Sequence, residues 1–338
     1  MQNNGQIMTA FRTGATSTER GVVLLLVLWI LSVLMVVAMS FSFITRTDAY
    51  SALAFKEGVE NKFLAEAGIE RGLMELVFRN VNRGQTVTLE GMDLVKTDGR
   101  AYYGQLGSGS YSFRVVDESG KININTLSDA SAVLLKNLLI NAGVPTGNAD
   151  VIADSILDWK DSDDLHRLNG AENDYYLSLP DPYSAKNAPF DTLEELLLVR
   201  GITPEILYGD GEKRGIIRFL TLSPETSSAI SVNVAPREVL LAIPGMTADI
   251  ADRVIADRKS DDPAAVPKAF EDIRIGIGQN YALVSQFLHT GGSNTFMIEA
   301  TGFRVSEKRG YPIRAVVVFE GSSKYRYQYY KSPAGKTK

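Results

Sequence analysis

The feature that most constrains this chain is an uncharged, apolar run near its N-terminus. From Val22 to Thr45 the sequence reads VVLLLVLWILSVLMVVAMSFSFIT, and Arg20 and Arg46 bracket it. In a helix these 24 residues rise about 36 Å, which is enough to cross a hydrocarbon core of about 30 Å. Arg12 and Arg20 precede the run, with Glu19 opposing them. The positive-inside tendency therefore predicts a transmembrane helix over residues 22–45, with its N-terminus in the cytoplasm.

A secretory signal peptide is the alternative interpretation, with Ala38, Met39 and Ser40 as a small-x-small cleavage site. The apolar run before that site has 17 residues, which is longer than the usual 7–15. The junction at Gly21 and Val22 argues for another kind of leader, because a charged segment ends there in a glycine and the apolar helix follows at once.

This junction resembles the class III leader of type IV pilins and pseudopilins, which a prepilin peptidase cuts after the glycine. The resemblance implies that residues 1–21 are removed between Gly21 and Val22, that Val22 is N-methylated, and that the helix stays attached. Most such subunits carry a glutamate at the fifth mature position, and this chain has Leu26 there. A carboxylate in lipid is costly unless it is paired. A subunit that has no other subunit above it has no such partner, and can therefore lack the glutamate. In lacking this glutamate, the chain resembles the minor pseudopilin K family of type II secretion systems (general secretion pathway protein K, GspK).

Beyond the membrane segment, an amphipathic pattern continues to about Asn82 and predicts a stem helix that lays its apolar face on a sheet. The segment around Gly68 and Gly72 also resembles the pseudopilin K family. Alternating patterns predict strands early and late in the chain, at Thr86–Leu89, Ala101–Leu106, Tyr111–Val116, Phe296–Ala300, Ile313–Phe319 and Tyr325–Tyr329. Neither set makes a comfortable sheet alone, so we expect one antiparallel sheet built from both sets, with residues 121–290 inserted between them.

The insertion has a helical pattern, with candidate helices at Asp129–Ala142, Asn148–Asp158, Thr192–Arg200, Pro236–Ala242 and Ala248–Arg258. A weak internal repeat links the segments 122–126 and 232–235, because each is a short extended piece that leads into a helix. The predicted fold class is α+β, with a transmembrane and stem helix on a pilin-like antiparallel sheet and a large all-α domain inserted between early and late strands. The predicted regions are 1–21 leader, 22–45 transmembrane helix, 46–120 stem and first strands, 121–290 inserted domain, 291–330 closing strands, and 331–338 disordered tail.

Charge is unevenly distributed along the chain. Residues 121–290 carry 15 Lys/Arg against 25 Asp/Glu, a local charge of −10, whereas residues 291–338 carry 9 against 3. Six carboxylates fall within 17 residues and repel one another unless a cation or solvent intervenes. Either a solvated acidic loop or a site for calcium, which takes six to eight oxygen ligands, fits this cluster. The string also resembles the calcium-binding loop of pseudopilin K, which implies structural Ca²⁺ and the candidate ligands Asp158, Asp161, Asp163, Asp164, Glu172 and Asp174.

The sequence offers few residues suited to catalysis. The absence of cysteine excludes thiol nucleophiles, disulfides and Cys-ligated metals. His166 and His289 have no serine nearby in a nucleophile context, so no catalytic residue and no enzyme activity are predicted. Turns at Gly201 and Gly245 resemble helix-hairpin-helix turns, whose backbone N–H groups can face DNA phosphate. The acidic charge of the insertion argues against a nucleic-acid partner.

The family resemblance implies a minor pseudopilin in the bacterial inner membrane, with its bulk in the periplasm, at the tip of a type II secretion pseudopilus. The implied partners are minor pseudopilins I and J in a tip complex, minor pseudopilin H and the major pseudopilin below, and the prepilin peptidase. Two alternatives remain open from the residues: a minor type IV pilin whose insertion is an adhesin, and a membrane-anchored calcium-dependent hydrolase.

Overall fold

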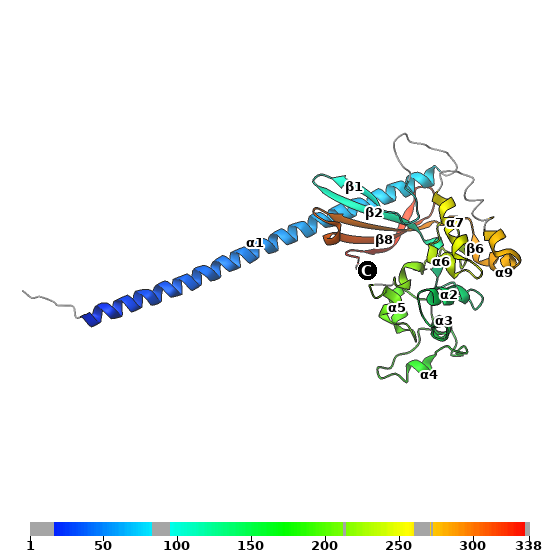
Figure 1. Ribbon diagram of the computed structural model, residues 1–338, viewed down its shortest axis with the longest axis horizontal. Coiled ribbons are helices and arrows are strands. Elements are labelled where there is room, and N and C mark those ends of the chain that lie inside the picture. Colours follow the sequence, from blue (N-terminus) through cyan, green and yellow to red (C-terminus); the bar gives the residue numbers. More distant parts are fainter. Residues whose placement is uncertain (1–16, 83–94, 212–213, 260–270, 272, 335–338) are drawn as a thin grey trace, which may run out of the picture. The chain divides into compact units, whose positions relative to one another are not determined.

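One long helix is the first element of the described residues (Figure 1). The computed structural model describes residues 17–82, 95–211, 214–259, 271 and 273–334. Helix α1 (Ser17–Val81) contains the apolar run and is long and apolar enough to cross a membrane. The large apolar side chains between Val22 and Ile44 are exposed along it, as expected of residues that face lipid. Residues up to Val59 form one compact unit, and residues from Glu60 onward form a second.

The second unit contains a five-stranded antiparallel sheet in the order β1-β2-β7-β8-β9. Its strands are β1 (Tyr102–Leu106), β2 (Gly109–Asp117), β7 (Thr295–Phe303), β8 (Tyr311–Phe319) and β9 (Tyr325–Lys331). Early and late strands join where β2 pairs with β7. The predicted closure of the sheet is therefore confirmed, and the expected strand at Thr86–Leu89 lies outside the described residues.

The C-terminal part of α1 packs on one face of this sheet. Ile69, Leu73 and Leu76 share a core with alternate residues of β2, β7 and β8, including Phe113 and Ile298. Gly68 and Gly72 make this approach possible, because a Cβ on Gly68 would lie 2.8 Å from Cβ of Ala300, and one on Gly72 would lie 2.9 Å from Cγ2 of Ile298. The buried helix face is thus matched to the sheet at the level of single methyl groups.

Replacing Gly72 by valine should lower the free energy of unfolding by about 1–3 kcal/mol, because added methyl groups in a packed core force neighbours to shift. The matched control is Gly58→Val in the same helix, where nothing lies within 4 Å of an added Cβ. Thermal unfolding of the full chain in detergent should show a lower melting temperature for Gly72→Val alone. Equal melting temperatures for both variants would contradict this packing.

The C-terminal end differs from the sequence expectation. Residues 331–338 were predicted to be a disordered tail, but Lys331 ends β9 and Ala334 is buried. The N–H of Ala334 donates to the carbonyl oxygen of Pro312 at 2.8 Å. This contact and the apolar surface of Ala334 hold residues 332–334 against β8, so the prediction was wrong for residues 331–334. Residues 335–338 lie outside the described residues.

The chain between β2 and β7 forms the inserted domain (Figure 1). This domain has a hydrophobic core of its own. Its helices are α2 (Ala132–Asn141), α3 (Thr146–Lys160), α4 (Asn173–Tyr176), α5 (Pro204–Tyr208), α6 (Arg237–Ala242), α7 (Ala248–Lys259) and α9 (Tyr281–Val284). Its short strands form two parallel pairs, β3 (Ile122–Asn123) with β4 (Leu220–Thr221) and β5 (Ile230–Ser231) with β6 (Leu288–His289). Short 3₁₀ turns complete the unit at Glu118–Gly120, Leu193–Leu198, Ile216–Phe219, Gly278–Asn280 and Ser285–Phe287. A further 3₁₀ turn, Glu307–Arg309, joins β7 to β8 of the sheet.

The expected helix at Thr192–Arg200 is the 3₁₀ turn η2 (Leu193–Leu198) instead of an α-helix. The other candidate helices are present with shifted ends. A glycine with positive φ stands in the turn between α6 and α7, where Gly245 has φ 80°. This conformation suits glycine, and it gives the turn a structural reason that needs no phosphate.

The inserted domain contains two similarly built halves. In each half a short strand leads through a turn into a helix, and a cation from a later helix binds the turn's carbonyl oxygens. Lys160 at the end of α3 donates to the carbonyls of Ile124, Asn125 and Leu127 at 3.0, 3.0 and 2.5 Å. Arg258 near the end of α7 donates to those of Val232 and Ala235 at 3.1 and 2.9 Å. The weak repeat at 122–126 and 232–235 is therefore a repeat of structure.

Candidate metal centre

The acidic segment begins on the last turn of α3, where the helix delivers Asp158 into the protein. The side chain of Asp158 has no exposed surface. Asp161 caps the end of α3, and Glu172 immediately precedes α4. Each of these three residues offers a carboxylate oxygen, and the oxygens all lie within 4.8 Å of one another. The fold thus gathers Asp158, Asp161 and Glu172 into one group, which we call the carboxylate triad.

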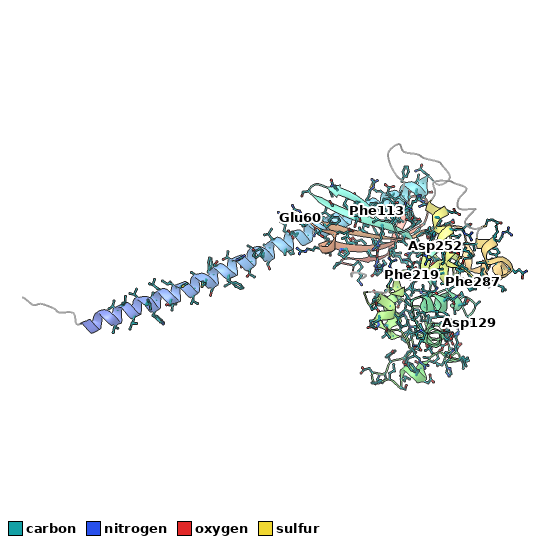
Figure 2. The ribbon with its side chains drawn as sticks, in the orientation of Figure 1. Glu60, Phe113, Asp129, Phe219, Asp252 and Phe287 are labelled. Atoms are coloured by element: carbon teal, nitrogen blue, oxygen red, sulfur yellow. The ribbon has the colours of Figure 1, made fainter. Side chains whose placement is uncertain are left out.

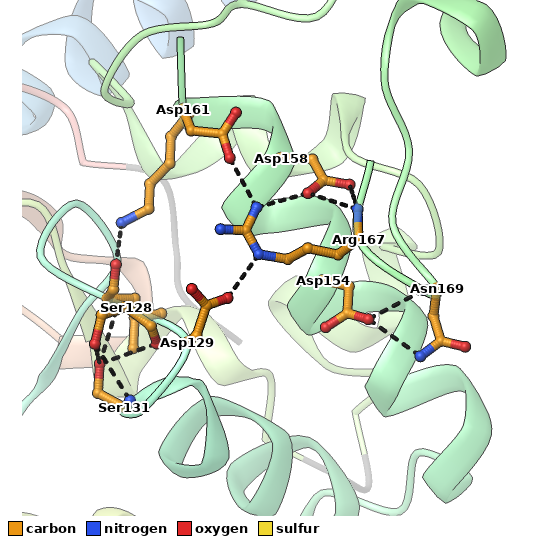
Figure 3. Close-up of polar contacts among 10 residues, drawn as sticks. Ser128, Asp129, Ser131, Asp154, Asp158, Asp161, Arg167 and Asn169 are labelled. Atoms are coloured by element: carbon orange, nitrogen blue, oxygen red, sulfur yellow. Dashed lines mark hydrogen bonds and ion pairs between the residues drawn. The ribbon is translucent and has the colours of Figure 1, made fainter. Parts of the chain in front are cut away.

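Arg167 supplies the positive charge nearest to this triad (Figure 3). Its Nη1 lies 2.7 Å from both Oδ1 of Asp158 and Oδ2 of Asp161, and its Nε donates to Oδ1 of Asp129 at 2.7 Å. The backbone N–H of Arg167 also donates to Oδ2 of Asp158 at 3.1 Å. One guanidinium therefore ties the loop to α3 and to the segment before α2, and these contacts raise the pKa of Arg167 above its ordinary value.

Glu172 is the uncompensated member of the triad. It is 2% exposed, and neither of its carboxylate oxygens has a hydrogen-bond partner. Burial raises its pKa to about 7, and the negative charges of Asp158 and Asp161 contribute to the same shift. Burial also raises the pKa of Asp158, against the opposing effect of Arg167. Since a buried, unpaired carboxylate is expensive, the triad favours either a proton or a second cation.

Aromatic packing holds the loop in this conformation. The ring of Trp159 meets that of Tyr176 edge-on, with centroids 5.1 Å apart, and stacks on that of Phe190 at 6.4 Å. Trp159 and Tyr176 are 3% and 0% exposed, so the residues beside Asp158 and Glu172 are core residues. A Cβ on Gly170 would lie 1.7 Å from Oδ2 of Asp158, so this close approach requires glycine.

The donor set fits calcium. Its atoms are hard carboxylate oxygens, and three of them, both oxygens of Glu172 and Oδ1 of Asp161, are buried without a hydrogen-bond partner. Calcium accepts such ligands in flexible geometry and completes its coordination with carbonyl or water oxygens. Asp158, Asp161 and Glu172 would therefore hold the ion, which would supply the positive charge that Glu172 lacks.

The other three predicted ligands lie outside the triad and are exposed. Asp163 accepts from the N–H of Leu165 at 2.9 Å, Asp164 from Nδ2 of Asn173 at 2.8 Å, and Asp174 from the N–H of Tyr175 at 2.8 Å. Sequence reasoning missed Arg167 and Asp129. The signal for Arg167 was a basic side chain inside an acidic run, which contains one other, Lys160, whereas nothing in the sequence links residue 129 to this loop.

The remaining predicted positions lie in α1 and in exposed places. Gly21, Val22 and Leu26 lie in α1, and Val22 and Leu26 are 63% and 55% exposed. His166 is exposed, and its Nδ1 lies 3.0 Å from the carbonyl oxygen of Arg167.

Comparison with known proteins shows what this chain is similar to. A family model described as "Type II secretion system (T2SS), protein K" matches residues 120–208, which include the triad. A type II secretion system protein K of Pectobacterium carotovorum subsp. carotovorum is 28% identical over 229 residues, covering 64% of this chain and 67% of that protein. A putative type II secretion system protein K of Escherichia coli K12 is 27% identical over 223 residues, covering 64% of this chain and 66% of that protein. The chain is therefore similar to type II secretion system protein K.

The chain spans about two thirds of the length of those relatives. Its fold matches a chain in the crystal structure of the GspK-GspI-GspJ complex from the type 2 secretion system of enterotoxigenic Escherichia coli. The TM-score is 0.59 at 17% identity, over 85% of this chain and 100% of that chain. The resemblance to protein K and the α+β fold predicted from the sequence are therefore confirmed.

Proposed function

We propose that this protein is the minor pseudopilin at the tip of a type II secretion pseudopilus, where it initiates and caps assembly for protein export across the outer membrane. The observation that carries the proposal is Leu26, in a chain that resembles protein K. A glutamate at this position would need the N-terminal amine of the subunit above as its partner in lipid. A leucine needs none, so this helix suits the one subunit that has no neighbour above it.

The partners follow from the same position. The relative of similar fold was solved with GspI and GspJ, and we propose the corresponding minor pseudopilins I and J as partners in the tip complex. Minor pseudopilin H and the major pseudopilin would lie below. The role is structural, without enzymatic activity. The helix lies in the inner membrane with its N-terminus in the cytoplasm, and the inserted domain lies in the periplasm.

Calcium is the proposed structural cofactor of the inserted domain, held by Asp158, Asp161 and Glu172. The two partnerless oxygens of Glu172 support it. In this role the ion neutralises the triad and fixes the segment between α3 and α4. The chain's own contribution is to hold the three carboxylates together, through the cap of α3, the Arg167 contacts and the aromatic packing of Trp159.

Deletion of the gene in the parent bacterium tests the proposed role. We expect secreted proteins to accumulate in the periplasm and to reappear in the medium when the full chain is supplied. Unchanged export, with normal amounts of the other pseudopilins, would contradict the proposal. Loss of surface pili with intact export would instead support a minor pilin.

Gly21→Leu should leave the chain unprocessed and unable to restore export, because the peptidase must cut beside a residue without a side chain. The matched control is Gly58→Leu, at another glycine of α1 with open space around it. Mass spectrometry of the N-terminal peptide should give Val22 as the mature terminus of the parent and of the control. A terminus after Ser40 would contradict this prediction and indicate a signal peptide.

A further inference from the structure

The inserted domain is attached to the sheet through two chain crossings. The first crossing runs from the end of β2 through the 3₁₀ turn Glu118–Gly120 to β3, and the second runs from β6 to the start of β7. Asp117, the last residue of β2, pairs with Phe296 near the start of β7, so both crossings leave the sheet at the same end. The orientation of the inserted domain on the sheet therefore depends on what holds these two crossings.

The hydrophobic cores of the sheet and of the inserted domain are separate clusters. Phe113 belongs to the core between α1 and the sheet, whereas Phe219 and Phe287 belong to the core of the inserted domain, and Figure 2 labels all three. The junction between the two parts contains buried polar side chains. They are Asp117, Glu118, Ser119, Lys121, Ser223, Ser231 and Thr295, each at most 5% exposed. Since hydrogen bonds are directional and apolar contact is not, we expect these polar groups to decide the orientation.

The carboxylate of Asp117 connects the two crossings. Its Oδ1 accepts from the N–H and the hydroxyl of Ser119 at 2.9 and 2.6 Å, and from the hydroxyl of Ser293 at 2.7 Å. Its Oδ2 accepts from the N–H of Ser293 at 3.3 Å. Ser119 lies in the first crossing and Ser293 in the second. These donors are neutral, so separation of the crossings would remove the hydrogen bonds that compensate the burial of this carboxylate.

One turn of the inserted domain contacts both crossings. Nδ2 of Asn233 donates to the carbonyl oxygen of Thr290, in the second crossing, at 2.6 Å. In the first crossing, a Cβ on Gly120 would lie 2.8 Å from both the carbonyl carbon and the carbonyl oxygen of Val234. The backbone of the first crossing therefore lies directly against this turn. The crossings that Asp117 joins to each other are thus also joined to the body of the inserted domain.

We propose that Asp117 is a clamp that holds the inserted domain in one orientation on the sheet, and that its loss lets the domain rotate while both hydrophobic cores stay intact. A fully satisfied buried polar network specifies one arrangement, and a partly satisfied one does not. Asparagine at position 117 would keep the size of the side chain but turn one acceptor into a donor, which would face the donors on Ser119 or Ser293. This inference is independent of the tip position and of calcium.

A pair of nitroxide labels on the full chain, in detergent and calcium, tests the inference. The chain has no cysteine, so Ser323→Cys after β8 and Asn148→Cys in α3, both at exposed positions, place one label on the sheet and one on the inserted domain. Double electron–electron resonance should give one narrow distance distribution for this labelled parent. Adding Asp117→Asn should roughly double its width, because a domain released from a clamp rotates about its connections. The fluorescence of Trp159 and the far-ultraviolet circular dichroism should stay those of the parent.

Two further variants locate the effect. Ser293→Ala removes the hydroxyl donor from the second crossing and should also broaden the distribution, so it decides the question if Asp117→Asn fails to fold. Asp154→Asn is the matched control, because the carboxylate of Asp154 accepts from the N–H and Nδ2 of Asn169, both at 3.1 Å, entirely inside the inserted domain. This control should leave the width unchanged. The parent width in a folded Asp117→Asn or in Ser293→Ala, or equal broadening by Asp154→Asn, overturns the proposal.

Discussion

Chelation of calcium by excess EDTA should lower the melting temperature of the full chain in detergent by about 5–10 °C. A ligand at about 100 times its dissociation constant stabilises the folded state by about 2.7 kcal/mol, and 1 kcal/mol moves the midpoint of a domain of this size by about 2–4 °C. The physical source is Glu172, whose two buried oxygens have no partner without the ion. Calcium should restore the original value, and magnesium should not, because it demands octahedral geometry and loses water reluctantly.

Two variants distinguish calcium binding at the triad from a general effect of divalent ions on the stability of the protein. Glu172→Gln should abolish the response to EDTA, because it removes the charge that the ion compensates. Asp181→Asn should retain the full response, since Asp181 is an exposed acid outside the triad. An unchanged melting temperature of the parent chain in EDTA, with no calcium in the purified protein, would refute the site.

The dependence of stability on pH gives an independent check. The pKa of Glu172 is raised from 4.5 to about 7, so between these values the folded state binds more protons than the unfolded state. Without calcium, the stability of the parent relative to Glu172→Gln should therefore increase as the pH falls from 7 to 5. With calcium bound, that increase should disappear, because the ion favours the ionised form. Melting temperatures at the two pH values, with and without EDTA, measure the difference.

Arg167→Met should cost about 3–5 kcal/mol of unfolding free energy in EDTA, the largest effect we expect from a single substitution. The variant leaves Asp158, whose side chain has no exposed surface, as a buried charge without its cation. With calcium present the loss should be smaller, because the ion supplies part of the missing positive charge. Urea unfolding followed through the fluorescence of Trp159, which is 3% exposed, measures both losses.

Arg304→Met is the matched control for this prediction. It removes an ion pair of equal length, 2.7 Å to Oε2 of Glu60, but the side chains are 40% and 36% exposed. Exposed pairs are worth about 0–1 kcal/mol. If Arg167→Met and Arg304→Met are equally stable in EDTA, Arg167 does not compensate a buried charge in the way described.

The fold could be predicted from the sequence where a periodic pattern extends over many residues. The uncharged run predicted the long apolar helix. Neither set of strands could form a sheet alone, and this predicted that early and late strands pair, as β2 and β7 do. The ends of helices and strands were predicted less accurately than their presence. The segment Leu193–Leu198 was expected to be an α-helix and is a 3₁₀ turn, because an apolar pattern does not show the hydrogen bonding at the ends of a segment. The burial of Ala334 was missed because one small residue gives no periodic signal.

The candidate site was only partly predictable. The density of acidic residues indicated the loop, but which carboxylates converge depends on where the chain returns after α3. Glu172 returns to Asp158 because Gly170 permits a close approach and Tyr176 is fixed in the core. Asp129 reaches the same place from another element, through Arg167. Such convergence is a property of tertiary structure, and no spacing in the sequence encodes it.

The repeated halves of the inserted domain could also be only partly predicted from the sequence. Lys160 and Arg258 bind corresponding carbonyls with different side chains. The turns they stabilise share few residues, so the sequence repeat is weak although the structural one is clear. The row of charged side chains Arg114, Glu299 and Arg314 likewise depends on strand register, since these residues become neighbours only across β2, β7 and β8.

The most direct test of the account is co-assembly. The full chain should be co-expressed with the I- and J-type pseudopilins of the same bacterium and extracted in mild detergent, with affinity purification through the J-type subunit. We predict one complex that contains all three proteins in equal amounts, with the chain beginning at Val22. Recovery of an I–J pair without this chain, while the chain is folded and present in the membrane, would contradict its place at the tip.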